Sequence, residues 1–325
     1  MPLAIQIAQN YNSSINIANK EVVLDSLSAC QKLNSAIISE KDFNESLETL
    51  RIEIEGYVHN YQYDQKILMV DDATKINKIA ETINSPLFVE KYKLFWQKSL
   101  VNKDNFLRNH DNFQNLSILY RMTHDLMAGY YRKYFDSNLA GKVVFAENNY
   151  KDFIRDFWLK ETGVALRDYY NLNNDLPAFF SKYSSEEEKI KLIFWFTYSR
   201  MHYDHKVWAH LKLTEIRQFN VGVCGQFGEM NSYLLLNNNF NPKVIYFDWN
   251  PSDPKTARHM LSYVKSQGSL YILDYHKISK YSAVATFLDS LKDHTYMKRI
   301  KDMYYLDLPT LYNKGLIFEN LKETE

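Results

Sequence analysis

The sequence predicts an α+β protein with a large, mainly helical N-terminal part followed by a part that contains an antiparallel sheet. Two observations support this class. Apolar residues recur at spacings of three and four over most of residues 20–203, and three short runs rich in β-forming residues follow at 243–249, 259–265 and 269–275. Helices that precede a block of consecutive strands are typical of α+β rather than alternating α/β architecture.

Seven helices are expected in the first part. The whole chain contains only 9 Gly and 7 Pro, and so little interruption favours long helices packed against one another. The last of the seven has the clearest start, because Ser185 and Glu188 form an S-x-x-E capping pattern. The expected ranges are 22–39, 40–60, 73–83, 87–107, 111–135, 150–170 and 185–202.

A further helix is expected in the motif GVCGQFGEM, residues 222–230. Phe227, Met230 and Leu234 recur there at helical spacing, so Cys224 would lie at the helix start, where the helix dipole favours a thiolate. The alternative is a buried structural cysteine, which is how we interpret Cys30. Beyond the three strands we expect another helix at 281–302 and an edge strand at 315–321.

Composition excludes several classes of function. Lys plus Arg equals Asp plus Glu at 39 each, so no overall charge attracts nucleic acid or an anionic membrane. Two cysteines are too few for a disulfide framework. No segment is apolar enough to span a membrane, and no signal peptide is recognisable. We expect a cytoplasmic protein, or a bacterial effector exported without a cleavable signal peptide.

The second and third strands would bring a base and an acid together. If Ser266 and Gln267 form the hairpin loop, His259 lies opposite Asp274. If Gln267 and Gly268 form it, His259 faces His276 and Asp274 is a diagonal neighbour on the same face. Either register keeps the two Cβ atoms within about 4.5 to 8 Å. A three-residue loop would place them on opposite faces.

Together, GVCGQFGEM, ARHMLSYV and LYILDY resemble the transglutaminase-like superfamily of papain-like fold, over about residues 185–280. The resemblance implies Cys224 as the nucleophile, His259 as the general base and Asp274 as the residue that orients the base. The resemblance does not extend to residues 1–180, where we expect a helical accessory domain, and we expect residues 181–325 to form the transglutaminase-like catalytic core with a C-terminal helix. Many members carry Trp soon after the catalytic His, whereas this chain has Met260 and Leu261.

An oxyanion needs hydrogen-bond donors, and the backbone N–H of Cys224 is the natural first one. Gln218 lies six residues before Cys224, the offset of the oxyanion-hole Gln in papain-like proteases, and we prefer it to Trp208 as the second donor. A solvated Gln218 is the alternative. His202, Asp204, His205 and His210 fit no standard zinc spacing, so we expect neither a metal nor a cofactor.

These features predict hydrolysis of a peptide or carboxamide bond in a protein or peptide substrate, through a thioacyl-enzyme. A transglutaminase or a glutamine deamidase would use the same three residues. A third interpretation is a catalytically silent interaction protein, whose N-terminal helices bind a protein partner.

Overall fold

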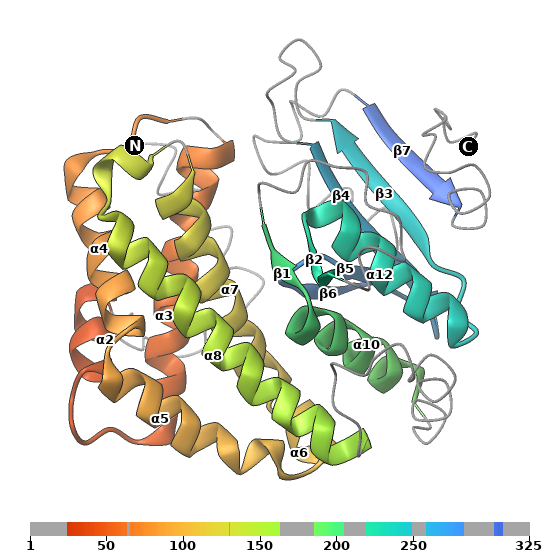
Figure 1. Cartoon of the computed structure of the whole chain (residues 1–325), viewed down its shortest axis with the longest axis horizontal. Coiled ribbons are helices and arrows are strands. Elements are labelled where there is room, and N and C mark those ends of the chain that lie inside the picture. The colour runs from red at the N-terminus through yellow and green to blue at the C-terminus, as the bar shows by residue number, and fades with distance from the viewer. Residues whose placement is uncertain are drawn as a thin grey trace.

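The computed structural model describes residues 25–63, 66–129, 131–162, 185–204, 219–248, 258–282 and 302–307. Within these ranges a helical N-terminal part lies beside an antiparallel sheet that carries a helix on its surface (Figure 1). The order of helices followed by strands is the predicted one. Among the described residues, no helix is long and apolar enough to cross a membrane.

Within the described ranges the N-terminal part contains seven α-helices, most of which begin at a side chain that caps the first turn. Asp25, Ser39, Ser85 and Asn102 each accept a hydrogen bond from a backbone N–H three residues later. The helices are α2 (Ser26–Leu33), α3 (Glu40–Val58), α4 (Val70–Ile83), α5 (Pro86–Gln97), α6 (Lys103–Arg108), α7 (His110–Ala128) and α8 (Ser137–Thr162).

Four of the expected helical ranges were wrong in extent, the first because α2 ends at Leu33 rather than at residue 39. The range 87–107 contains two helices and a short 3-10 turn, Ser99–Val101, because Asn102 caps a new helix. Helix α7 ends at Ala128, where Gly129 adopts an extended backbone. Helix α8 begins at Ser137, well before the expected residue 150, and the side chain of Asp136 accepts from the N–H of Asn138 at its start.

Aromatic residues fill the core between these helices. The rings of Trp96 and Phe113 lie 5.3 Å apart, and those of Phe106 and Phe157 stack at 4.8 Å. The same buried cluster continues through Trp195 to Phe227 and Leu273. One continuous core therefore connects the helical part to the sheet.

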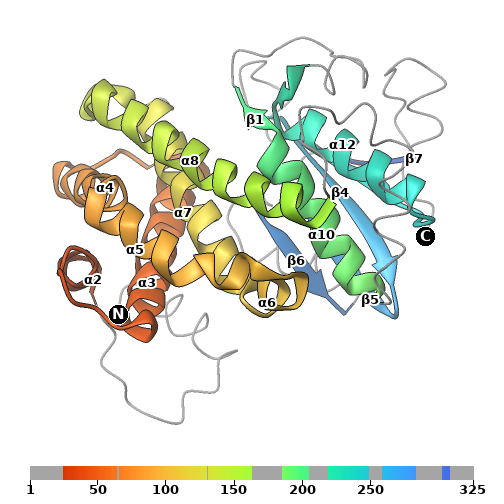
Figure 2. The same ribbon diagram turned by 60° about the horizontal axis from the view of Figure 1, so that its bottom comes forward.

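Helix α10 (Glu186–Arg200) joins the two parts. Its start is the predicted one, because Ser185 Oγ accepts from the N–H of Glu188 at 3.4 Å. It contacts α8 on one side and α12 (Cys224–Asn237) on the other (Figure 2). Glu187 binds the sheet directly, since it accepts hydrogen bonds from Tyr271 Oη at 2.8 Å and Lys280 Nζ at 2.6 Å.

Among the described residues, the main sheet has five antiparallel strands in the order β6-β5-β4-β3-β7. Strands β3, β4 and β5 are the three predicted ones, and β6 and β7 were not expected. Tyr281 and Asp302, the ends of a predicted helix, belong to strands, while the predicted edge strand at 315–321 lies outside the described residues. The strands are β3 (Lys243–Asp248), β4 (Arg258–Ser266), β5 (Ser269–Leu273), β6 (Ile278–Tyr281) and β7 (Asp302–Asp307).

A second, two-stranded pair connects α10 to α12. Strand β1 (His202–Tyr203) follows α10 and runs parallel to β2 (Val221–Gly222), which immediately precedes α12. Tyr203 pairs with Gly222. The pair thereby places the end of α10 next to the N-terminus of α12.

Candidate active site

Cys224 is the first residue of helix α12, as the sequence predicted. Val223 before it is extended, and its N–H donates to the side-chain oxygen of Gln226 at 2.9 Å. This bond is one half of a capping box, and it fixes the first turn of the helix. Cys224 is 8% exposed, so its thiol lies at the helix N-terminus with little contact with water.

The glycines of the motif allow close packing around Cys224. A Cβ atom on Gly222 would lie 2.4 Å from Cβ of Gln226, so only glycine fits there. Gly225 and Gly228 face the side chain of Met260 on β4, with ideal Cβ positions 3.7 and 3.6 Å from its nearest atoms. Helix α12 therefore lies directly on the strand that carries His259.

His259 on β4 is hydrogen-bonded to Asp274, the first residue after the neighbouring strand β5. Ser262 pairs with Leu273 and Ser266 with Ser269, so Gln267 and Gly268 form the hairpin loop, the second of the two expected registers. His259 Nε2 lies 3.0 Å from the Asp274 carboxylate. The two side chains are 14% and 22% exposed, which makes this a mostly buried ion pair when His259 is protonated.

His259 is also hydrogen-bonded to the Cys224 side chain. Burial lowers the pKa of His259, but the charge and hydrogen bond of Asp274, together with the interaction with Cys224, raise it well above its ordinary value. Burial raises the pKa of Asp274, and the charge and hydrogen bond of His259 outweigh this effect and lower it. The structure thus brings Cys224, His259 and Asp274 into one connected group.

The turn after β5, which carries Asp274, is held by three side chains of α7. Gln114 Oε1 accepts from the N–H of Ile278 at 3.0 Å, and Ser117 Oγ donates to the carbonyl of His276 at 3.1 Å. Asp125 Oδ2 accepts from the hydroxyl of Tyr275 at 2.8 Å. Within the turn, the N–H of Asp274 donates to the carbonyl of Lys277 at 2.8 Å.

Arg121 on the same helix packs against two aromatic rings beside Cys224. Its guanidinium lies 4.0 Å from the ring centroid of Tyr203 and 5.5 Å from that of Tyr275, and it pairs with Asp125 at 2.5 Å. The Tyr275 ring is 6.1 Å from the His259 ring. Sequence reasoning did not find these α7 residues, because nothing in the sequence relates them to a motif some 100 positions later.

Other predicted site residues lie outside the described part of the chain. These are Gln218 and Trp208, the candidates for a second oxyanion donor, and His205 and His210 of the possible metal cluster. Within the described ranges, no three His, Cys, Asp or Glu side chains are placed to hold a metal ion.

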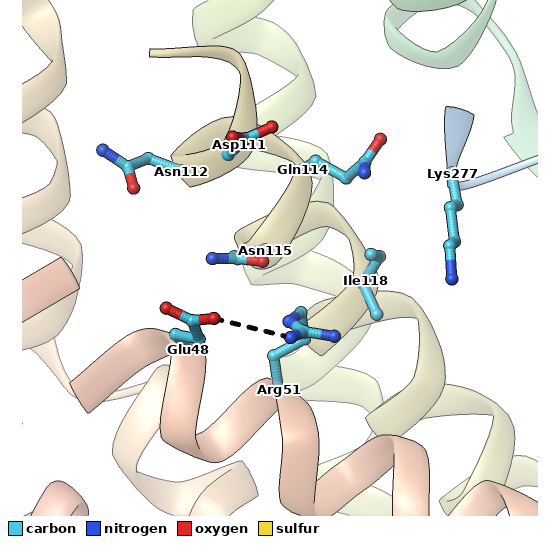
Figure 3. Close-up of a pocket in the computed structure, with 8 residues that line it drawn as sticks. All are labelled: Glu48, Arg51, Asp111, Asn112, Gln114, Asn115, Ile118 and Lys277. Atoms are coloured by element: carbon cyan, nitrogen blue, oxygen red, sulfur yellow. Dashed lines mark ion pairs between the residues drawn. The ribbon is translucent and has the colours of Figure 1, made fainter. Parts of the chain in front are cut away.

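A polar pocket of about 480 Å³ lies between α3, α7 and the turn after β5 (Figure 3). Arg51 and Glu48 form an ion pair at 3.8 Å on one side, and Lys277 approaches from the turn on the other. Cys224, His259 and Asp274 are not part of its lining, so it is distinct from the group around Cys224. It is lined by Glu48, Arg51, Asp111, Asn112, Gln114, Asn115, Ile118 and Lys277.

Comparison with known proteins finds a family model that matches the segment around Cys224, His259 and Asp274. No curated protein and no solved structure matches the chain. A family model described as a transglutaminase-like domain matches residues 167–304, a segment that includes Cys224, His259 and Asp274. This segment is therefore similar to transglutaminase-like domains.

Proposed function

We propose that the protein is a cysteine-dependent acyl-transfer enzyme of papain-like fold that hydrolyses a peptide or carboxamide bond. Cys224 is the nucleophile, His259 the general base and Asp274 the residue that orients His259. The observation that carries the proposal is the position of His259, hydrogen-bonded to Asp274 at 3.0 Å and to Cys224 at the start of α12.

The electrostatics of the group favour a protonated His259. Asp274 accepts from Nε2 of His259, which leaves the other ring nitrogen, Nδ1, for Cys224. The pKa of His259 is held well above its ordinary value, with burial opposed by Asp274 and Cys224. A protonated His259 and the N-terminus of α12 both stabilise negative charge on sulfur.

The reaction follows from these positions. The Cys224 thiolate forms a bond to the carbonyl carbon, and the π electron pair moves to the carbonyl oxygen, which becomes an oxyanion. Its collapse restores the carbonyl and breaks the C–N bond, while His259 gives its proton to the leaving amine. His259 then takes a proton from water, which attacks the thioacyl carbon. The products are a carboxylic acid and the regenerated Cys224–His259 pair.

Reaction with a peptide that carries a thiol-directed electrophile in place of the scissile amide tests the nucleophile. Wild-type protein is expected to be labelled, and Cys224→Ala is expected to lose all labelling. Cys30→Ala is the matched control, because Cys30 is the only other cysteine and is 1% exposed in the helical core. Labelling that survives in Cys224→Ala would overturn the assignment.

The acyl acceptor is tested separately. Wild-type protein is incubated with a glutamine-containing peptide library in ¹⁸O-labelled water containing a primary amine, and the products are identified by mass spectrometry. Backbone cleavage with ¹⁸O in the new carboxylate is the expected result. A side-chain amide to the added amine would identify a transglutaminase, and ¹⁸O in a glutamate side chain a deamidase; either product without cleavage would contradict a protease.

His259→Ala tests whether turnover needs a general base or only a reactive thiol. It keeps the sulfur and removes the base, so we expect turnover to fall by about 10² to 10⁴-fold. Unchanged turnover in this variant would contradict the role of His259.

A further inference from the structure

We propose that the hydroxyl of Tyr203 is a catalytic hydrogen-bond donor that stabilises the oxyanion together with the backbone N–H of Cys224. This inference rests on the function proposed above and adds a residue to it. Tyr203 belongs to β1, directly after α10, and the sequence alone gave it no role because its neighbour Gly222 in the β1–β2 pair is 19 positions away.

The β1–β2 pair fixes the position of Tyr203 relative to Cys224. His202 N–H donates to the carbonyl of Asn220 at 2.8 Å, and Asp204 N–H donates to that of Gly222 at 3.0 Å. Tyr203 is therefore bound on both sides to the segment that leads into α12. Its hydroxyl oxygen accepts a hydrogen bond from the backbone N–H of Cys224, which is the N–H expected to bind the oxyanion.

Three neighbours fix the direction of the Tyr203 ring. The ring lies 4.6 Å from the Tyr275 ring and 6.0 Å from the Phe227 ring, measured between centroids. The Arg121 guanidinium lies 4.0 Å from its centroid and is itself anchored by Asp125. A donor held in this way loses little entropy when the oxyanion forms, which is the requirement for strong electrostatic stabilisation.

Tyr203 stays protonated over the working pH range. Burial, followed by the negative charges of Cys224 and Asp125, raises its pKa well above the ordinary value, against the lowering effects of Arg121 and of the Cys224 N–H. A neutral phenol retains its O–H as a donor.

The proposed step moves no proton to or from Tyr203. When the thiolate attacks, the carbonyl oxygen receives the π electron pair and binds both donors at the start of α12. The Cys224 N–H turns from the Tyr203 oxygen to the oxyanion, and the Tyr203 O–H donates to the same oxyanion. Collapse of the tetrahedral intermediate returns the pair to the carbonyl, and Tyr203 again accepts from Cys224.

Two reactions of Cys224 distinguish stabilisation of the oxyanion by Tyr203 from an effect of Tyr203 on the reactivity of the thiol. Acylation by a peptide thioester or activated ester passes through an oxyanion, whereas alkylation by iodoacetamide displaces iodide at a saturated carbon and forms none. Tyr203→Phe keeps the ring and its packing and removes only the hydroxyl. We expect it to slow acylation about 10² to 10³-fold, with alkylation within about twofold of wild type.

Tyr271→Phe is the matched control. Tyr271 is a buried tyrosine of strand β5, in the five-stranded sheet, and its hydroxyl donates to Glu187, so its loss is expected to leave both rates unchanged. The alkylation rate also reports folding, because a misfolded Tyr203→Phe protein would not retain the reactivity of the Cys224–His259 pair.

Each remaining outcome is decisive. If wild type and Tyr203→Phe acylate equally fast, Tyr203 is not an oxyanion donor, although the proposed function stands. If both acylation and alkylation fall together in a folded variant, Tyr203 acts on the thiol and the inference is wrong. If wild type alkylates but accepts no acyl donor, the proposed function itself fails.

Discussion

Tyr275 donates its hydroxyl hydrogen to Asp125, 2.8 Å away and 150 positions earlier in the chain. Tyr275 follows Asp274 directly, and Asp125 also binds Arg121, whose guanidinium faces Tyr203 and Tyr275. A buried ion pair of helix α7 thus supports both sides of the group around Cys224. The helical part contributes to the site itself.

Asp125→Ala is expected to destabilise the protein by about 3 to 5 kcal/mol, because it removes the carboxylate that pairs with the buried charge of Arg121. Burial lowers the pKa of Arg121, but Asp125 and Glu147 raise it above its ordinary value, so the guanidinium does not escape by losing its proton. The free energy of unfolding in urea measures the effect.

The matched control is Asp111→Ala on the same helix, whose side chain is 97% exposed and which we expect to change stability by at most about 0.5 kcal/mol. A double variant, Arg121→Met with Asp125→Leu, should recover much of the loss, because it removes both buried charges. An Asp125→Ala protein as stable as wild type would show that the Arg121–Asp125 ion pair does not stabilise the protein.

The hairpin between β4 and β5 shows which part of the candidate site could be predicted from the sequence and which part could not. Period-two patterning located both strands, but two loop registers fitted it equally well. The structure selects Gln267 and Gly268, whose φ angles of 47° and 76° are those of a type I′ turn. Glycine accepts such angles readily and glutamine does not, so the sequence offered only half of the usual turn signal.

Gln267→Asn is expected to stabilise the protein by several tenths of a kcal/mol, because asparagine tolerates the left-handed conformation better. Gly268→Ala should destabilise it by about 1 kcal/mol, since alanine pays the cost of positive φ. Thermal unfolding of both variants checks the signs. A destabilising Gln267→Asn would mean that the side chain, rather than the backbone angle, determines the preference at this position.

The glycine motif around Cys224 gives a further stability test. Gly222→Ala places a Cβ atom 2.4 Å from Cβ of Gln226. The Gln226 side chain also accepts the hydrogen bond from Val223 that caps α12. We expect a loss of about 1 to 3 kcal/mol from this overpacking. Urea unfolding measures it.

Gly141→Ala is the control for that substitution, because nothing lies within 4 Å of its added Cβ. It lies in α8, where alanine is expected to stabilise the helix by about 0.5 to 1 kcal/mol. Opposite signs at the two glycines are the expected result, and a harmless Gly222→Ala would contradict the close packing at the start of α12.

Local patterns predicted the helix at Cys224, the cap at Ser185 and three strands, because each depends on residues close together in sequence. They did not predict the contribution of α7. Gln114, Ser117 and Asp125 reach the turn after β5 through contacts separated by 150 to 164 positions, and no local pattern encodes such contacts. The domain boundary near residue 180 stays a prediction.

Two buried histidines predict how stability depends on pH. Burial lowers the pKa of His276 and of His202 from 6.5 to about 4. The two histidines therefore become protonated near pH 6.5 in the unfolded chain, but only near pH 4 in the folded chain. Their contribution to stability is complete above pH 6.5 and is lost progressively as the pH falls toward 4.

His276 offers the sharper test, because its side chain is 4% exposed and neither ring nitrogen has a hydrogen-bond partner among the residues that the structure describes. His276→Gln removes one of the protons, so the slope of unfolding free energy against pH between 6.5 and 4 should decrease by up to about 1.4 kcal/mol per pH unit. His202→Gln should produce a second decrease, and the double variant the sum. An unchanged slope in His276→Gln would mean that His276 accepts its proton within the folded protein, beside Asp274, and that the turn after β5 tolerates the charge.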